Sequence, residues 1–178
     1  SGSRVFDMAN GVAIDGAGNV YVVGQQGGIP GRRGMGESDA YLRKHDGDGN
    51  ELWTRQFGSQ SGPSASGVAV DGEGNVYVVG SASGALPGQT HSGSSDAYVR
   101  KYDGNGNELW TRQFGSRGVD RASGVVVNGA GDLYVAGTTR LSLPGQSNME
   151  PVLGGSDVFI RKYDSDGNEV WARQSGSG

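Results

Sequence analysis

Arginine and aromatic side chains alternate along two short stretches that occur three times in the chain. In the middle copy the order is Tyr98, Arg100, Tyr102 and then Trp110, Arg112, Phe114. The equivalent residues are Tyr41, Arg43, His45, Trp53, Arg55 and Phe57 in the first copy and Phe159, Arg161, Tyr163, Trp171, Arg173 and Ser175 in the third. A guanidinium stacks on aromatic rings and donates to carboxylates or carbonyls. These side chains could therefore form a packing layer or a sugar pocket with an aromatic floor, and their repetition favours packing.

Aspartate-rich pentapeptides suggest calcium as a second candidate chemistry. Residues 46–50 and 164–168 both read Asp-x-Asp-x-Asn, which resembles the start of a calcium loop. Such a loop also needs Gly at its sixth position and a bidentate acid at its twelfth. Here the sixth residue is Glu and the twelfth is Phe57 or Ser175. We therefore expect no metal site and assign these residues to turns.

Single acids and histidines carry little further chemistry. Asp39, Asp96 and Asp157 each open the third predicted strand of a copy, where we expect local bonds to loop backbone; their repetition around a ring could instead line a central or top-face site. His45 and His91 occupy different repeat positions, and His45 stands where another copy has Tyr. No Ser/His/Asp set, phosphate-binding loop before a helix or zinc spacing is present. We predict no enzyme activity, no catalytic residue and no cofactor.

Composition excludes several classes of partner. The chain has 178 residues, a net charge of −4 and no cysteine. An acidic chain does not favour nucleic acid, which requires a basic surface. No apolar run is long enough to span a bilayer. The absence of cysteine excludes disulfides and thiolate metal sites. We expect a soluble chain without a membrane span.

Four short strands are predicted in each copy. In the middle copy they cover residues 68–70, 76–79, 96–102 and 108–114, which are rich in Val, Tyr, Trp, Phe and Thr and bounded by Gly, Asn and Asp. No long window shows apolar residues at helical spacing. The sequence therefore predicts an all-β chain with essentially no helix.

Tight turns join these strands into hairpins. Six pentapeptides begin with Asp or Asn and have Gly at their fourth position: Gly18, Gly49, Gly74, Gly106, Gly131 and Gly167. The second position tolerates Ser165. This asymmetry predicts a type I turn followed by a glycine with positive φ. Each copy is thus two tight hairpins joined by a longer loop.

The copies recur at a nearly constant period, which indicates a repeat architecture. Trp53, Trp110 and Trp171 are 57 and 61 residues apart. We divide the chain into units 7–62, 63–119 and 120–178, with 1–6 as the remnant of a preceding unit, and treat it as one domain. Both ends fall just after a fourth strand. We therefore expect an excised or engineered three-repeat piece of a longer array.

This unit resembles a known repeat. The half Val-Ala-Val-Asp-Gly-x-Gly-Asn-Val-Tyr-Val, together with Leu86-Pro87-Gly88-Gln89 and residues 96–103, resembles the bacterial SBBP repeats of β-propellers, and the first half is also similar to NHL repeats. The resemblance implies that each unit is a propeller blade. It also implies a secreted or cell-surface bacterial parent of mostly unknown role. Residues 29–32 and Ser175 depart from the pattern of the other copies.

Three blades are too few to close a ring, because propellers have about four to eight. Two chains joined head to tail would supply six blades and hide both open ends. We therefore predict a homodimer that forms one six-bladed ring, with blade three of one chain packed by its face on blade one of the other. Strand exchange at this junction and a dimer that is not a ring are the alternatives. Three chains would give nine blades, above the usual range.

Function is less constrained than fold. The first hypothesis is a non-catalytic scaffold that presents loops for interaction. The second is a glycan-binding lectin with sites in loops 25–38, 81–95 and 138–156, but these loops contain no Trp or Tyr. The third is an enzyme with a central-channel site, which would require an unrepeated polar residue on a first strand. The first strands read Val-Ala-Ile, Val-Ala-Val and Val-Val-Val, so no such residue is present.

Overall fold

A computed structural model describes residues 7–27, 38–58, 62–146 and 155–176. The predicted remnant at 1–6 and the departure at 29–32 lie outside these residues. So do most of the first long loop and part of the third.

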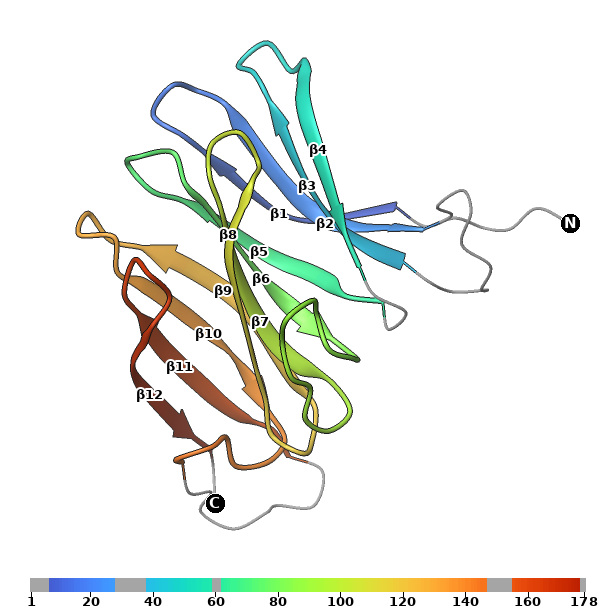
Figure 1. The fold of residues 1–178 in the computed structure, drawn as a ribbon, viewed down its shortest axis with the longest axis vertical. Coiled ribbons are helices and arrows are strands. Elements are labelled where there is room, and N and C mark those ends of the chain that lie inside the picture. Colours follow the sequence, from blue (N-terminus) through green and yellow to red (C-terminus); the bar gives the residue numbers. More distant parts are fainter. Residues whose placement is uncertain (1–6, 28–37, 59–61, 147–154, 177–178) are drawn as a thin grey trace, which may run out of the picture.

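Within these described ranges, twelve strands form three separate four-stranded sheets. The strands are β1 (Asp7–Ile14), β2 (Val20–Gly27), β3 (Ser38–His45), β4 (Glu51–Phe57), β5 (Ser64–Val70), β6 (Val76–Ala82), β7 (Asp96–Tyr102), β8 (Glu108–Phe114), β9 (Asp120–Val127), β10 (Leu133–Thr139), β11 (Asp157–Tyr163) and β12 (Glu169–Ser175). Within each sheet, neighbours in the chain pair antiparallel in chain order. We call the sheets β1–β4, β5–β8 and β9–β12 blades one, two and three; Figure 1 shows them side by side.

The sequence predicted the outer strands better than the inner ones. In blade two, β7 and β8 have the predicted bounds, whereas β5 starts four residues earlier and β6 ends three residues later than expected. The missed part of β5 contains Ala65 and Gly67, between which the register shifts. A bulge of small residues breaks the period-two pattern by which a strand is recognised. No helix occurs in the described ranges, which agrees with the prediction.

The six tight turns have the predicted conformation. In residues 103–107, Gly106 N donates to Asp103 O (3.0 Å), and Asp103 N donates to Asn107 O (2.9 Å). Asp103 Oδ1 accepts from Asn105 N (2.9 Å) and Asn107 N (2.8 Å). All six fourth-position glycines have positive φ, from 77° at Gly167 to 86° at Gly49. The aspartate therefore holds the turn through backbone amides, and glycine makes its left-handed residue accessible.

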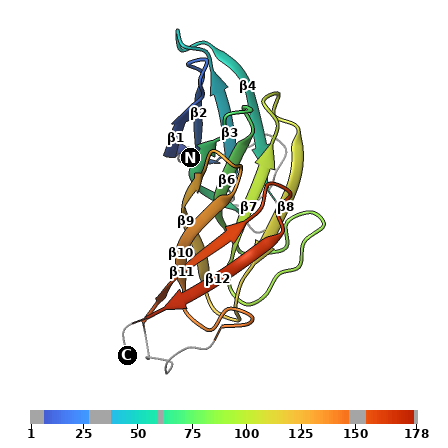
Figure 2. The same cartoon turned by 90° about the vertical axis from the view of Figure 1, so that its left-hand side faces the viewer.

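The core lies between the blades. One buried cluster joins Tyr21, Val23 and Leu42 of blade one to Val76 and Val78 of blade two. A second cluster does the same between blades two and three. We call the face of a blade that meets the preceding blade its leading face, and the opposite side its trailing face. Figure 2 shows blade two between the other two in the side view.

Among the residues that the structure describes, no helix is long and apolar enough to cross a membrane.

Acid should weaken the turns. The hydrogen bond from the Asn107 side chain holds the pKa of Asp103 below its ordinary value of 3.8. A lowered pKa contributes stability that is complete above the ordinary value and is lost as pH falls through the lowered one. We expect Asp103→Ala to lower the melting temperature by a few degrees at pH 7, and this loss to shrink as the pH falls below about 4.

Asp103→Asn is the matched control. Asn128 naturally occupies the first position of another of the six turns, residues 128–132, and accepts from Ala130 N and Asp132 N there. This variant should stay near the parent at pH 7 and lose the acid dependence of this turn. Thermal melts from pH 2.5 to 7 measure both effects. Equal damage by Ala and Asn at pH 7 would contradict the assignment.

Candidate functional site

The two arginine and aromatic stretches lie on opposite faces of each blade. In blade two, Val99 pairs with Arg112 across β7 and β8, so Arg112 shares the face of Val99 and not that of Arg100. The third-strand residues therefore form a ladder on the leading face: Tyr98, Arg100 and Tyr102. The fourth-strand residues form a ladder on the trailing face: Trp110, Arg112 and Phe114. The trailing ladder of one blade meets the leading ladder of the next.

Phe57 contacts three residues of blade two at the first of these junctions. Its ring lies 6.0 Å from Tyr98 and 6.2 Å from Tyr102, measured between ring centroids, and Arg100 Cζ lies 4.6 Å from its centroid. Burial raises the pKa of Tyr102 to about 12. The packing interpretation of these residues is consistent with this geometry, because the rings face another blade.

The junction between blades two and three repeats the arrangement. Phe114 lies 5.4 Å from Phe159 and 6.4 Å from Tyr163, and Arg161 Cζ lies 4.0 Å from the Phe114 centroid. Burial again raises the pKa of the tyrosine, Tyr163, to about 12. The same contact thus recurs with different residues.

Arginines of the trailing ladder bind the turn of the following blade. Arg55 donates from Nε to Gly106 O (2.8 Å) and from Nη2 to Asn105 O (2.8 Å). Arg112 donates from the same atoms to Gly167 O (2.8 Å) and Asp166 O (3.2 Å). All four acceptors are backbone carbonyls, so the contact requires the shape of the turn and not its side chains.

Lysine and tryptophan reinforce this contact. Lys44 Nζ donates to Gly104 O (3.3 Å) and Lys101 Nζ to Ser165 O (3.1 Å) of the following blade. Trp110 Nε1 donates to Ser165 O as well (3.3 Å). In each blade the tryptophan also lies under the arginine two residues on, at 5.2 to 5.8 Å from Cζ to the ring centroid.

Blade three presents the same set without a following blade among the described residues. Arg173 stacks on Trp171 and donates from Nη1 to Ala172 O (2.7 Å), a bond within the blade that Arg55 and Arg112 also make. Lys162 Nζ lies 2.8 Å from Asp132 Oδ2. The trailing ladder of blade three is therefore assembled but does not bind a turn within the described chain.

The outer faces of the end blades expose apolar positions that are covered elsewhere. On the trailing side, Val158 and Ile160 are 54% and 46% exposed, whereas Ala97 and Val99 of blade two are fully buried. On the leading side, Val12 and Ile14 are 69% and 65% exposed. Their counterparts in blade two, Val68 and Val70, pack against the first core cluster. Within the part of the chain that the structure describes, these two faces thus lack the cover that the inner junctions have.

Three equivalent glycines on the innermost strands, one from each blade, also show which blades have a neighbour on the trailing face. A Cβ on Gly11 would lie 3.3 Å from Gly67 Cα, and one on Gly67 would lie 3.3 Å from Ser123 O of β9. A Cβ on Gly124, the third of the series, would meet nothing within 4 Å. Gly124 therefore faces open space where the other two approach the next blade.

Leading-face arginines contact their own blade and the preceding one. Arg100 Nε donates to Thr111 Oγ1 (2.8 Å) while its guanidinium stacks on the preceding blade. Arg43, which has no preceding blade among the described residues, stacks on its own Tyr41 at 4.8 Å and binds Gln26 Oε1 (2.8 Å). Its buried Nε has no hydrogen-bond partner among the described residues, and the same is true of Arg161 Nε, which does have a preceding blade.

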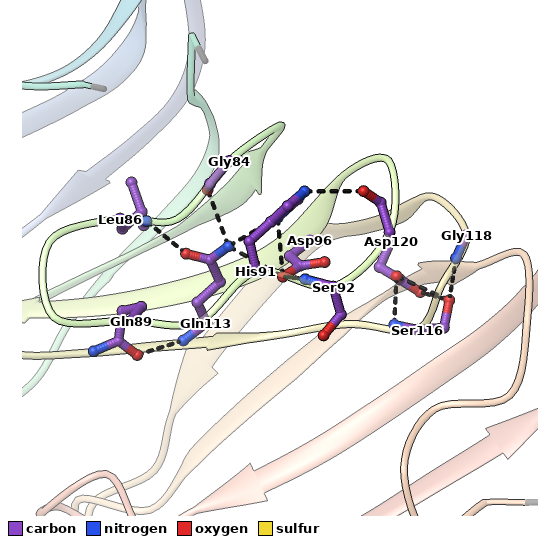
Figure 3. A network of polar contacts seen from close by, with 11 residues as sticks. Gly84, Leu86, Gln89, His91, Ser92, Asp96, Gln113, Ser116, Gly118 and Asp120 are labelled. Carbon is purple, nitrogen blue, oxygen red and sulfur yellow. Dashed lines mark hydrogen bonds and ion pairs between the residues drawn. The ribbon is translucent and has the colours of Figure 1, made fainter. Parts of the chain in front are cut away.

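A polar network holds the long loop of blade two (Figure 3). Gln113 Nε2 donates to Asp96 Oδ2 (3.1 Å), which also accepts from Ser92 N (2.9 Å) and lies 3.2 Å from His91 Nδ1. Gln113 Oε1 accepts from Leu86 N (2.8 Å). The expected local backbone bond of Asp96 is therefore present. Sequence reasoning missed Gln113, although Gln56, Gln113 and Gln174 recur at one repeat position.

A second buried acid lies beside this network. Asp120 accepts from Ser116 N (2.7 Å) and Ser116 Oγ (3.0 Å). Burial first, and the nearby Asp96 charge to a lesser extent, raise the pKa of Asp120. Gly115 separates the two acids: a Cβ there would lie 2.4 Å from Asp96 Oδ1 and 2.9 Å from Asp120 Oδ2. The acids fix the chain between blades two and three.

The predicted calcium-like turns use their oxygens internally. Asp46 Oδ1 accepts from Asp48 N (3.0 Å) and Asn50 N (2.8 Å), and Oδ2 accepts from Asn50 Nδ2 (2.9 Å). Asp164 makes the equivalent bonds. Within the described ranges, no group of three or more His, Cys, Asp or Glu residues is arranged to hold a metal.

Comparisons with known proteins give two curated relatives. The chain is 33% identical over 148 residues to "Regulatory protein FlaEY" of Caulobacter vibrioides, covering 79% of this chain and 15% of that protein. It is 26% identical over 114 residues to "Uncharacterized WD repeat-containing protein L264" of Acanthamoeba polyphaga mimivirus, covering 58% of this chain and 8% of that one. The chain thus spans only a small part of either relative.

A solved structure of a protein of unknown function from Bacteroides caccae is also similar, with 14% identity and a TM-score of 0.38 over 95% of this chain and 82% of that one. This score is too low to support a conclusion about the fold.

A family model matches one stretch of the chain. Residues 52–87 match the SBBP β-propeller repeat. They run from β4 of blade one through β5 and β6 to Leu86 and Pro87 of the blade-two loop, and so cross the junction between two blades. This stretch of the chain is therefore similar to the SBBP β-propeller repeat, and the described residues fold into three four-stranded antiparallel blades.

Proposed function

We propose that this chain is a non-enzymatic propeller scaffold that pairs with a second copy to close a six-bladed ring and presents its loops for interaction. The supporting observation is the pair of inner junctions, which repeat one set of contacts. Among the described residues, the two halves of a third such junction are uncovered: the trailing face of blade three and the leading face of blade one. A second copy supplies the matching half at both ends.

The polar contacts favour the head-to-tail arrangement. Lys162, Trp171 and Arg173 occupy the positions that bind a turn in the other blades, and blade one offers the turn 46–50 with the same backbone hydrogen bonds. In the proposed ring, Arg173 Nε donates to Gly49 O of the second copy, by analogy with the bonds of Arg55 and Arg112. A Cβ on Gly49 would meet nothing within 4 Å, whereas one on Gly167 would lie 2.9 Å from Trp110. That space would hold Trp171 of the second copy.

Burial supplies the driving force. Exposed Val12, Ile14, Val158 and Ile160 would be removed from water at each closing junction, and large apolar patches on a monomer mark interaction sites. Two chains give six blades, within the range in which propellers close. A head-to-tail contact that closes after two copies leaves no open end.

We infer the interaction role from this architecture, because the loops lie at the edges of the blades whereas the packing residues lie between them. The bacterial relative, of which this chain spans 15%, is named a regulatory protein. We infer an exported bacterial origin, as the resemblance to SBBP repeats implies. No observation favours the glycan alternative over the packing role of the aromatic residues.

Absolute mass in solution tests the ring directly. Light scattering on a sizing column across a dilution series should give twice the chain mass of 18.3 kDa. A monomer at all concentrations would overturn the proposal, and a trimer would require a nine-bladed ring.

Gly124→Leu tests which faces meet. A Cβ at this position meets nothing within 4 Å in the described chain, and the leucine would enter the space that Gly11 of the second copy occupies in the proposed ring. Overpacking at two junctions should raise the dimer dissociation constant by roughly 30-fold or more. Sedimentation velocity over a concentration series measures this change.

Gly72→Leu is the matched control, because a Cβ on Gly72 would also meet nothing within 4 Å, and Gly72 lies in the 71–75 turn of the middle blade, at the second turn position, where the 164–168 turn has Ser165. It should leave the dissociation constant unchanged. An unchanged dimer in Gly124→Leu would show that the inner strands do not meet at the closing junction.

A further inference from the structure

The two inner junctions share one aromatic contact between the trailing ladder of one blade and the leading ladder of the next. Phe57 of β4 lies against Tyr102 of β7, and Phe114 of β8 lies against Tyr163 of β11, at 6.2 and 6.4 Å between centroids. Phe57, Tyr102 and Tyr163 are buried. Each junction thus places a phenylalanine from the trailing face against a tyrosine from the leading face.

Both members of this pair are replaced in the blades that have an open face. Ser175 stands where Phe57 and Phe114 stand, and His45 stands where Tyr102 and Tyr163 stand. These residues belong to blades three and one, which blade two separates within the chain (Figure 1). They do not meet in one copy, yet they occupy the two positions that touch across a junction.

We propose that Ser175 of one copy faces His45 of the other across the closing junction, and that this polar pair makes the contact between copies weaker than the aromatic contacts within a chain. The proposal rests on the ring proposed above. It identifies the residues that set the affinity between the two copies, and therefore how readily the ring opens.

Hydrogen-bond chemistry supports the pairing. His45 Nδ1 lies 3.2 Å from Gly49 O, and a neutral imidazole that donates from Nδ1 accepts at Nε2. The Ser175 hydroxyl is a donor that can bond such a nitrogen directly or through a water molecule. A serine in the place of a phenylalanine ring leaves room for that water.

The loss of the rings should also lower affinity. An aromatic pair contributes stabilisation beyond its buried area, and a serine–histidine pair lacks this contribution. The remainder of the leading ladder, Tyr41 and Arg43, is retained in blade one. The junction therefore keeps its general form and loses one contact.

A double-mutant cycle tests the pairing. Ser175→Phe and His45→Tyr together should restore the inner contact and lower the dimer dissociation constant by more than the product of the single effects. Because the ring contains two closing junctions, we expect an extra factor of roughly fivefold to a hundredfold, measured by sedimentation of the parent, both single variants and the double variant. A stable dimer in which the two effects are independent would overturn the pairing and leave the ring standing. Monomers in all four proteins would overturn both.

Cross-linking supplies a second measurement that is independent of affinity. The chain has no cysteine, so Ser175→Cys and His45→Cys each introduce a single thiol. A short bis-maleimide should link the two variants when they are mixed and should link neither variant alone. Linkage of Ser175→Cys to itself would indicate that two trailing faces meet, and would overturn the pairing.

Discussion

Mutual burial of sheet faces determines the architecture of this chain. A four-stranded blade has two apolar faces, and neither is covered by anything within its own unit. Val76 and Val78 are buried by the preceding blade, while Tyr77 and Val79 are buried by the following one. A blade therefore needs a neighbour on each face, and among the described residues blade two has both neighbours while blades one and three each have one.

Polar contacts determine which face of one blade packs on which face of the next. Apolar faces alone would permit blades to slide or to meet trailing face to trailing face. The guanidinium groups of Arg55 and Arg112 prevent such slippage, because they match two carbonyls of one turn in a fixed geometry. Stacking of Arg100 and Arg161 on the preceding phenylalanines adds a contact that requires unlike faces. The arginine and aromatic residues, for which the sequence favoured packing over a sugar pocket, thus define the order in which blades pack.

The sequence predicted the local structure well, because local chemistry determines it. The glycine at the fourth turn position needs positive φ in every copy, and alternation on β7 and β8 is undisturbed. The bulge between Ala65 and Gly67 was missed, since small residues carry no alternating signal. The role of Gln113 was missed for a different reason: its partners, Leu86 and Asp96, are far from it in the chain. The ladders were recognised, but only the fold could place them on opposite faces.

The backbone acceptors of the arginine contact have a consequence for the history of such chains. Arg55 binds a turn that reads Gly104-Asn105-Gly106, and Arg112 binds one that reads Ser165-Asp166-Gly167, through the same carbonyl positions. Because recognition ignores side chains, gene duplication yields a unit that already fits both neighbours. Blades can then be gained, lost or exchanged by recombination while their loops diverge, and no new docking chemistry has to arise at any step.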